Sequence, residues 1–394
     1  MKKDQSSLLI LFSVVVLDLV GFGIVVPILP FYAEKYGANA TVLGLLLTSY
    51  AVMQFTFSPV WGNLSDRIGR KKVLLLTMAG SVLGLLVLGL AKSLVMLFAG
   101  RILSGMFGAN ISVASAYVTD VTTTENRAKG MGMIGAAFGI GFILGPALGG
   151  ILSVYGYATP ILCAAGLGAV NIVYALFRLG ESHPVRREGP TASRASVLRI
   201  PLVRRLCLIN FLFTLGVNQL ESIFAFFMAD RFHYDARHVA YILAMMALIM
   251  VAIQGGMIKR LVLRFGEKLL VRVGCALLAI AFFFVPESHT VWFLLIPLAI
   301  SAVGRGISQP SLMSLVSRGG DESLHGTVMG TFQASASLAR VFGPLVAGLL
   351  YDRQMAYPFF LACALLVLVF LLSLGLHVQD ARHRHPETRP AEAL

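Results

Sequence analysis

The chain consists mainly of long apolar runs separated by short polar segments. Each run has roughly the 20 residues that a helix needs to cross the hydrocarbon core of a bilayer. The runs number twelve and cover residues 8–30, 42–61, 73–91, 94–118, 130–153, 158–179, 206–228, 239–258, 269–285, 291–316, 327–351 and 358–376. Most lack the polar face that a soluble helix shows at helical spacing. The pattern therefore predicts an all-α polytopic membrane protein with twelve transmembrane helices.

The two halves of the chain resemble each other. The turn Ile68-Gly69-Arg70-Lys71 recurs half a chain later as Phe265-Gly266-Glu267-Lys268, and Gly145-Pro146 recurs as Gly343-Pro344. Six spans in each half make these parallel repeats, which place a substrate site between the halves near the membrane midplane. We expect a six-helix bundle at 1–180, a cytoplasmic linker at 181–205, a second six-helix bundle at 206–378 and a cytoplasmic tail at 379–394.

Charge fixes the expected orientation. The chain is 57% hydrophobic and 13% charged, with a net charge of +13, whereas a soluble domain has about 25% charged residues. If the spans alternate, most Lys and Arg residues fall in the short loops of one side, and the positive-inside rule puts both termini in the cytoplasm. We expect a monomer in the lipid bilayer of the cell membrane, the inner membrane of a bacterium. Because no basic domain stands outside the spans, we expect no nucleic acid partner.

Four motifs, three within spans and one in a loop, carry a resemblance to a known family. They are residues 17–23 (LDLVGFG) in the first span, 62–72 (GNLSDRIGRKK) between the second and third, 101–105 (RILSG) in the fourth and 141–150 (GFILGPALGG) in the fifth. The last three resemble signatures of the major facilitator superfamily. The first resembles the opening span of its twelve-span, tetracycline-resistance-like drug:proton antiporters. The resemblance to this family covers nearly the whole chain.

The resemblance implies a fold and an activity. The fold is two pseudo-symmetric six-helix bundles, and the activity is proton-coupled antiport, the efflux of small amphipathic compounds or drugs by alternating access. It assigns a conformational latch to Gly62, Asp66, Arg67, Gly69 and Arg70. It also assigns a seal between the halves to the antiporter motif residues Gly141, Gly145, Pro146, Gly149 and Gly150. The extra acids of tetracycline exchangers have no match at 73–91 or 269–285, so transport of tetracycline itself stays open.

Ionisable side chains inside the spans are the candidates for chemistry, because each costs about 2.5–3.5 kcal/mol at a helix centre on insertion scales. They are Asp18, Arg101, Glu221, Arg305 and Arg340, with Asn218 and Gln219 beside Glu221. A carboxyl group in an apolar cavity holds a proton more readily than one in water, as a proton-coupled carrier requires. The alternative for Asp18 is a structural hydrogen bond or ion pair, and for Arg101 a structural pair with Asp18 or with backbone carbonyls.

Two readings of the arginines in the second half remain. Arg305 and Arg340 either attract an anionic group of the substrate or neutralise Asp18 and Glu221. Aromatic residues of two spans are further candidates to line an apolar pocket: Tyr50, Phe55, Phe224, Phe226 and Phe227.

Other chemistry finds no support in the sequence. The chain has no P-loop, no HExxH motif and no metal-ligand spacing, so we expect no enzymatic activity, no metal and no cofactor. The proton gradient is the expected energy source. The alternatives are a carrier of organic anions or lipid-like molecules and a non-transporting membrane receptor or scaffold. The identity and charge of the substrate, the stoichiometry and the acid that carries the proton are left open.

Overall fold

The computed structural model describes residues 2–122, 124–182, 194–317 and 325–376. These residues are almost entirely helical. The expected tail at 379–394 and residues 183–193 of the expected linker at 181–205 lie outside the described residues. The described residues resume at 194 with a short helix, α9 (Arg194–Leu198), which precedes the second half.

The first half contains eight α-helices: α1 (Lys2–Val25), α2 (Leu29–Glu34), α3 (Ala40–Ile68), α4 (Arg70–Gly89), α5 (Leu94–Met106), α6 (Asn110–Val121), α7 (Thr124–Leu152) and α8 (Ala158–Arg178), with a 3₁₀ turn at Ser153–Tyr155. The first predicted span stops at α1 because Pro27 has no amide hydrogen to continue the helix, and α2 restarts with Pro30 in its first turn. The fourth span is the pair α5 and α6, interrupted at residues 107–109.

The second half repeats this organisation. It contains α10 (Pro201–Phe232), α11 (Ala236–Ala252), a π-helical turn at Ile253–Met257, α12 (Ile258–Phe265), α13 (Glu267–Phe284), α14 (Val291–Ser317), α15 (His325–Tyr351) and α16 (Tyr357–Leu374). The two repeated turns share a backbone feature, since Gly69 and Gly266 both have a positive φ, 104° and 76°. A side chain is strained in that region, which explains why both copies keep glycine.

Eleven of the described helical segments are long and apolar enough to cross a membrane. The remaining span is α13, where Glu267, Lys268 and Arg272 shorten the apolar stretch of an 18-residue helix. α13 nevertheless packs between α14 and α16, as a transmembrane helix of the bundle does. The prediction of an all-α protein with twelve membrane helices is thus confirmed.

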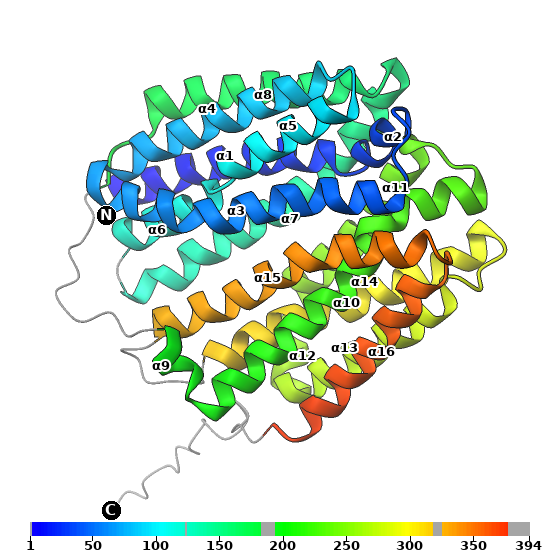
Figure 1. Ribbon diagram of the computed structural model, residues 1–394. Coiled ribbons are helices and arrows are strands. Elements are labelled where there is room, and N and C mark those ends of the chain that lie inside the picture. The colour runs from blue at the N-terminus through cyan, green and yellow to red at the C-terminus, as the bar shows by residue number, and fades with distance from the viewer. Residues whose placement is uncertain (1, 123, 183–193, 318–324, 377–394) are drawn as a thin grey trace, which may run out of the picture.

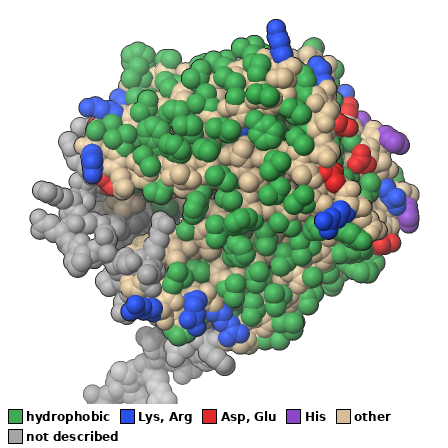
Figure 2. Space-filling model, in the orientation of Figure 1, with side chains coloured by type: hydrophobic (Ala, Val, Ile, Leu, Met, Phe, Trp, Pro, Cys, Tyr) green, Lys and Arg blue, Asp and Glu red, His purple; other side chains and the backbone are tan. Residues whose placement is uncertain are grey.

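The helices form two bundles that lie side by side (Figure 1). In the first, α1 packs on α7 and α8, and α4 packs on α5 and α8. In the second, α10 packs on α15 and α16, and α13 on α14. We call the end where α1 begins and α16 ends the terminal end, and the end that carries α2 and the start of α3 the far end (Figure 1). Between the ends, hydrophobic side chains cover the flank that Figure 2 shows, while acidic and histidine side chains gather at the far end.

The bundles meet chiefly through two helix pairs, α3 with α15 and α7 with α11. Near the far end these helices touch backbone to backbone. A Cβ added at Gly44 would lie 2.4 Å from the carbonyl oxygen of Pro344, and one at Gly348 would lie 2.2 Å from that of Ala40. Such close approach of glycines is how membrane helices pack tightly.

Asp352 fastens the far end across the two bundles. It follows α15, and its two carboxylate oxygens accept hydrogen bonds from the backbone amides of Ala40 (3.1 Å) and Thr41 (2.9 Å) at the start of α3. An anion at a helix N-terminus satisfies free amides and faces the positive end of the helix dipole. The structure is therefore closed at the far end, by contacts that the motifs of the first half did not predict.

We expect Asp352→Ala to shift the protein away from this closed state. Loss of a helix cap costs typically about 1 kcal/mol, roughly a fivefold change in the ratio of closed to open molecules. Distance measurements between spin labels at the far ends of the two bundles check this. Arg353→Ala, one residue further along and exposed, is the control. An unchanged distance distribution in Asp352→Ala would show that the cap does not hold the closed state.

A second expectation concerns pH at the far end. Burial raises the pKa of Glu34 above its usual range, and the nearby charge of Asp230 in the other bundle raises it further. A carboxyl group whose pKa is raised in the closed state binds its proton more tightly there than in the open state. The closed state is therefore stabilised relative to the open state as the pH falls through that pKa, and it loses this stabilisation as the pH rises above it. The spin-label distances should shift towards closure on acidification, and Glu34→Gln should flatten that response. A response of equal size in Glu34→Gln would remove Glu34 from this role.

Candidate functional site

Tyr50 on α3 lies at the centre of the charged side chains that occupy the middle of the spans. Its hydroxyl is within electrostatic reach of Asp18 and Arg101 in its own bundle and of Arg340 in the other. Arg340 is in turn within reach of Glu221 and Arg305. All five charged residues predicted from the sequence therefore belong to one connected group between the bundles, the inter-bundle site.

Asp18 lies on the side of this site that faces the interior of the first bundle. Its Oδ1 accepts a hydrogen bond of 2.9 Å from Nδ2 of Asn110, the first residue of α6. Both residues line a small cavity with Leu74 and Met78 of α4. Asp18 thus has a polar partner within its own bundle, and no ion pair between Asp18 and Arg101 occurs among the described residues.

Arg101 on α5 is buried against Tyr50. Its guanidinium carbon lies 4.2 Å from the centre of the Tyr50 ring, a cation–π contact, and its Nε has no hydrogen-bond partner among the described residues. Gln54 Nε2 bridges the Tyr50 hydroxyl (3.3 Å) and the carbonyl of Gly108 (2.7 Å), at the break between α5 and α6. Tyr50 is therefore held in place from two sides, and its contacts tie α3 to the broken fourth span.

The second bundle contributes a neutralised pair and a further arginine. Glu221 of α10 forms an ion pair with Arg305 of α14. Arg340 of α15 is exposed, and its guanidinium donates a long hydrogen bond of 3.5 Å to Ser337 Oγ one turn back on its own helix. Glu221 and Arg340 are accessible to water although they sit in mid-span, because they face the space between the bundles.

Asn218 and Gln219 occupy a different place from Glu221. Both are buried in the packing of α10 on α15, with their amide nitrogens directed at the carbonyls of Ala339 (3.5 Å) and Gly343 (3.4 Å). The aromatic residues that follow them are buried as well. Phe227 is fully buried and packs edge-on against Phe359 of α16 at 5.0 Å. The expectation that Phe224, Phe226 and Phe227 line a pocket is wrong, because these rings fill the core of the second bundle.

The glycines of the antiporter motif bring α7 close to α1. A Cβ added at Gly141 would lie 2.5 Å from that of Leu19, and one at Gly145 would lie 2.6 Å from Cα of Gly23. Gly149 approaches the carbonyl of Ile24 in the same way. The motif therefore holds α1, the helix that carries Asp18, against α7.

Gly150, the last residue of the motif, faces the other bundle. A Cβ there would lie 2.4 Å from Cβ of Ala240 on α11. Pro146 lies inside α7, and its Cδ would lie 3.2 Å from a Cβ added at Gly23. The motif thus contributes both to the first bundle and to its contact with the second.

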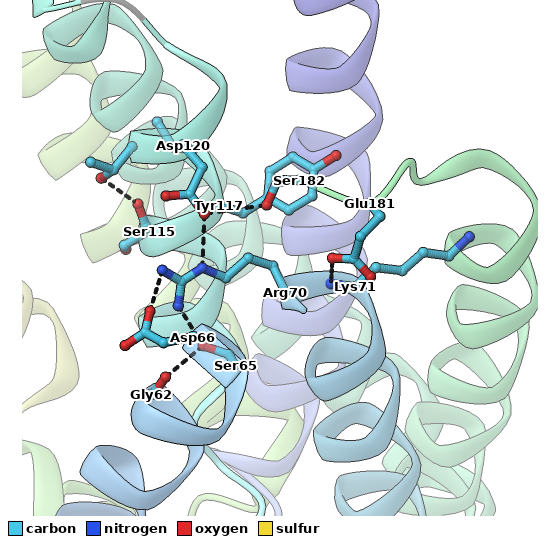
Figure 3. A network of polar contacts seen from close by, with 12 residues as sticks. Gly62, Ser65, Asp66, Arg70, Lys71, Ser115, Tyr117, Asp120, Glu181 and Ser182 are labelled. Atoms are coloured by element: carbon cyan, nitrogen blue, oxygen red, sulfur yellow. Dashed lines mark hydrogen bonds and ion pairs between the residues drawn. The ribbon is translucent and has the colours of Figure 1, made fainter. Parts of the chain in front are cut away.

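The predicted latch forms a network around Arg70 (Figure 3). The guanidinium of Arg70 binds Asp66 at 2.5 Å, Asp120 at 2.8 Å and Ser65 Oγ at 2.5 Å. These residues join the end of α3, the start of α4 and the end of α6. Among the described residues, the partners of Arg70 lie within the first bundle, and Asp66 pairs with Arg70 itself. Arg67 is exposed.

Asp120 and the neighbours of Gly180 were not identified from the sequence. Ser182 Oγ donates to Asp120 (3.3 Å), and Glu181 accepts from the amide of Lys71 (3.0 Å) (Figure 3). Tyr117 donates to the carbonyl of Gly180 (2.9 Å). The start of the linker is thereby fixed to the latch. Asp120 could have been found from the sequence as an acid at the end of the fourth span, where a membrane helix emerges beside a basic loop.

We expect Asp120→Ala to destabilise the protein more than Asp66→Ala. The side chain of Asp120 is 8% exposed and that of Asp66 is 55% exposed. Removing one partner of a buried pair costs about 3–5 kcal/mol, whereas an exposed pair contributes about 0–1 kcal/mol. Thermal unfolding of the purified variants in the same detergent checks the order. Equal losses would place the stabilisation elsewhere in the network.

The second copy of the turn has a different chemistry. Glu267 stands where the first copy has Arg70, is fully buried, and accepts a hydrogen bond of 3.1 Å from Ser314 on α14. Leu263 stands where the first copy has Asp66. The second copy of the turn therefore carries the opposite charge at the position of Arg70.

No metal site is evident in the part of the chain that the structure describes. It contains no group of three His, Cys, Asp or Glu side chains arranged to hold a metal ion. The inter-bundle site brings together groups of both charges. It offers an acid at membrane depth, a cation–π pair, an ion pair and an exposed guanidinium, all close to the surface along which the bundles meet.

Known proteins are similar to this chain in both sequence and fold. The family model described as Major Facilitator Superfamily matches residues 11–344 and 258–393. The class C tetracycline resistance protein of Escherichia coli is 32% identical over 359 residues, covering 89% of this chain and 90% of that protein. Multidrug resistance protein 2 of Bacillus subtilis is 27% identical over 385 residues, covering 95% of each.

Two solved structures extend the comparison. The human organic anion transporter MFSD10 (TETRAN) is 26% identical, with a TM-score of 0.74 over 94% of this chain and 99% of that one. A bacterial homologue of the human lysosomal transporter Spinster, in an inward-facing, occupied conformation, shares the fold, with a TM-score of 0.76 at 14% identity over 93% of this chain and 95% of that one. This protein is a multi-pass membrane transporter rather than an enzyme, and it belongs to the major facilitator superfamily.

Proposed function

We propose that the chain is a secondary-active antiporter that exports small amphipathic compounds in exchange for protons. The observation that carries the proposal is Asp18, a carboxyl group at membrane depth that lies in a small, largely apolar cavity with Asn110 and within reach of Tyr50. Protonation of such a group costs little and changes the charge next to the inter-bundle site. The antiporter motif on α7 packs directly against the helix that carries it.

Alternating access supplies the mechanism. Movement of the bundles about a site between them exposes that site first to one side of the membrane and then to the other. Binding biases such an equilibrium only if the two states differ in affinity. In this proposal Asp18 releases its proton on one side and takes one up on the other, and its charge alters the affinity of the inter-bundle site. Arg101 keeps its proton and acts through its charge.

We further propose that the terminal end lies in the cytoplasm. The loops of that end carry most of the Lys and Arg residues, as the positive-inside rule requires. The described state, closed at the far end, would then face inward. The names of the relatives support an amphipathic substrate, since they include tetracycline resistance and multidrug resistance proteins.

A panel of fluorescent amphipaths in proteoliposomes with an imposed pH gradient tests the proposal. We expect at least one compound to move against the direction of the proton gradient, with no movement when the gradient is collapsed by an ionophore. Vesicles without protein are the control for passive leak. Transport that is indifferent to the ionophore for every compound that moves would contradict proton coupling.

A further inference from the structure

The charges at the inter-bundle site do not balance. It contains three arginines and two acids. The ion pair between Glu221 and Arg305 neutralises one of each. Asp18 faces the interior of the first bundle, where Asn110 is its hydrogen-bond partner. The remaining positive charges, Arg101 and Arg340, both act on Tyr50.

Arg340 is the arginine that is open to a ligand. Arg101 is buried under the ring of Tyr50, whereas Arg340 is exposed. The salt bridges among the described residues give Arg340 no carboxylate within 4.0 Å. A guanidinium keeps its charge under all physiological conditions and presents five donors in a fork that matches a carboxylate. At membrane depth such a group is costly unless an anion or water satisfies it.

The position of Arg340 places it where the two bundles begin to separate. The next residue, Val341, accepts a hydrogen bond of 2.9 Å from Thr48 Oγ1 of α3. From there to the far end the two helices stay in contact through Gly44 and Gly348. Arg340 is therefore at the inner limit of the closed zone, and its side chain lies across from Tyr50.

An apolar wall adjoins this charge. The rings of Tyr50 and Phe22 lie 5.9 Å apart, those of Phe22 and Phe142 6.1 Å apart, and those of Phe142 and Phe138 6.2 Å apart. These rings come from α3, α1 and α7, and all four side chains are partly exposed. A row of aromatic faces beside a guanidinium fits a molecule with an aromatic body and an acidic group.

We propose that Arg340 binds the carboxylate of an amphipathic organic anion whose apolar body lies along this row of rings. That this anion is a transported substrate rests on the proposed function, because the inference names the substrate class of the same site. Binding of the anion is independent of the proposed function, because binding needs no proton gradient. Arg101 acts through Tyr50 and adds to the positive potential without touching the ligand.

Three dansyl compounds with the same ring system test the proposal: dansylglycine (anionic), dansylamide (neutral) and dansylethylenediamine (cationic). Their affinities are measured by equilibrium dialysis against the full chain in nanodiscs without a pH gradient. We expect the wild type to bind dansylglycine at least about tenfold more tightly than the other two, the usual effect of one charge-assisted contact. Arg340→Gln should abolish this preference and leave the affinity for dansylamide within about twofold.

Two further variants separate a binding role from a structural one. Arg340→Lys keeps the charge and should restore part of the preference for dansylglycine. Arg353→Gln removes an exposed arginine beyond the end of α15 and should change nothing. Equal affinities for the three compounds in the wild type, or equal weakening of all three in Arg340→Gln, would overturn the proposal. The second result would make Arg340 a partner of Glu221 or a packing residue.

The two proposals fail in different ways. Preferential binding of dansylglycine together with transport that ignores the pH gradient would support the anion site and contradict proton coupling. Proton-driven transport of the neutral or cationic compound, without any preference for dansylglycine, would support coupling and overturn the anion site.

Discussion

We expect Asp18→Asn to abolish transport driven by a pH gradient and to leave the fold intact. Asparagine has the shape of aspartate, and its carbonyl oxygen can still accept the hydrogen bond of 2.9 Å from Asn110. What it loses is the ability to release a proton. The variant should therefore bind substrate and exchange it between the two sides, because that exchange needs no net proton transfer. Uptake energised by the pH gradient should fall to the level of vesicles without protein.

The measurement compares two modes of transport in the same proteoliposomes. Counterflow of labelled against unlabelled substrate reports the movement of the bundles, and gradient-driven uptake reports coupling. Glu287→Gln, an exposed acid at the far end, is the matched control and should behave as wild type in both. If Asp18→Asn retains gradient-driven uptake, another acid carries the proton. If it loses both modes, Asp18 has a structural role in the first bundle.

We expect Gly145→Ala to lower the stability of the protein although it adds a single methyl group. The new Cβ would lie 2.6 Å from Cα of Gly23 and 2.8 Å from the carbonyl oxygen of Val20, both of them backbone atoms of α1. No flexible side chain is available to yield, so α1 and α7 must separate. Overpacking of this kind costs about 1–3 kcal/mol, and we expect a fall in Tm of about 5 °C.

Gly135→Ala in the same helix is the control for this change. No heavy atom of a neighbour lies within 4 Å of a Cβ added there, and alanine favours a helix over glycine by about 1 kcal/mol. Its Tm should be equal to or above that of the wild type. A similar loss in both variants would mean that glycine matters along α7 for its flexibility and not for the close approach to α1.

The sequence predicts those features of the fold that are local. Span length and apolar character follow from each segment by itself, and the twelve helices were therefore found. One helix, α13, departs from this rule, because Glu267, Lys268 and Arg272 lie within it and shorten its apolar stretch. The two turns with glycine at a positive φ were also visible as a repeat, because a backbone requirement leaves the same residue in both copies.

The partners of the charged residues could not be predicted in this way. Arg70 was recognised as part of a latch, but its buried partner Asp120 is fifty positions away on α6. Asp352 caps a helix that begins more than three hundred positions earlier. The choice among several acids depends on which helix faces which, a property of the packed bundles that is absent from any one span.

Polarity alone does not show which face of a helix a residue lies on. Asn218, Gln219 and Glu221 are close in sequence, yet a helix turns by about 100° per residue and distributes them over different faces. Glu221 faces the space between the bundles, and the two amides face α15. Their part in proton coupling or substrate binding stays a prediction.

The most direct test of the account is whether substrate movement drives protons in the opposite direction. Proteoliposomes loaded with a transported amphipath and a pH indicator are diluted into medium of the same pH that lacks the amphipath. The account predicts that protons enter as the amphipath leaves, so the lumen acidifies in wild-type vesicles and keeps its pH in vesicles with Asp18→Asn. Efflux of the amphipath without any change of luminal pH in the wild type would contradict proton antiport.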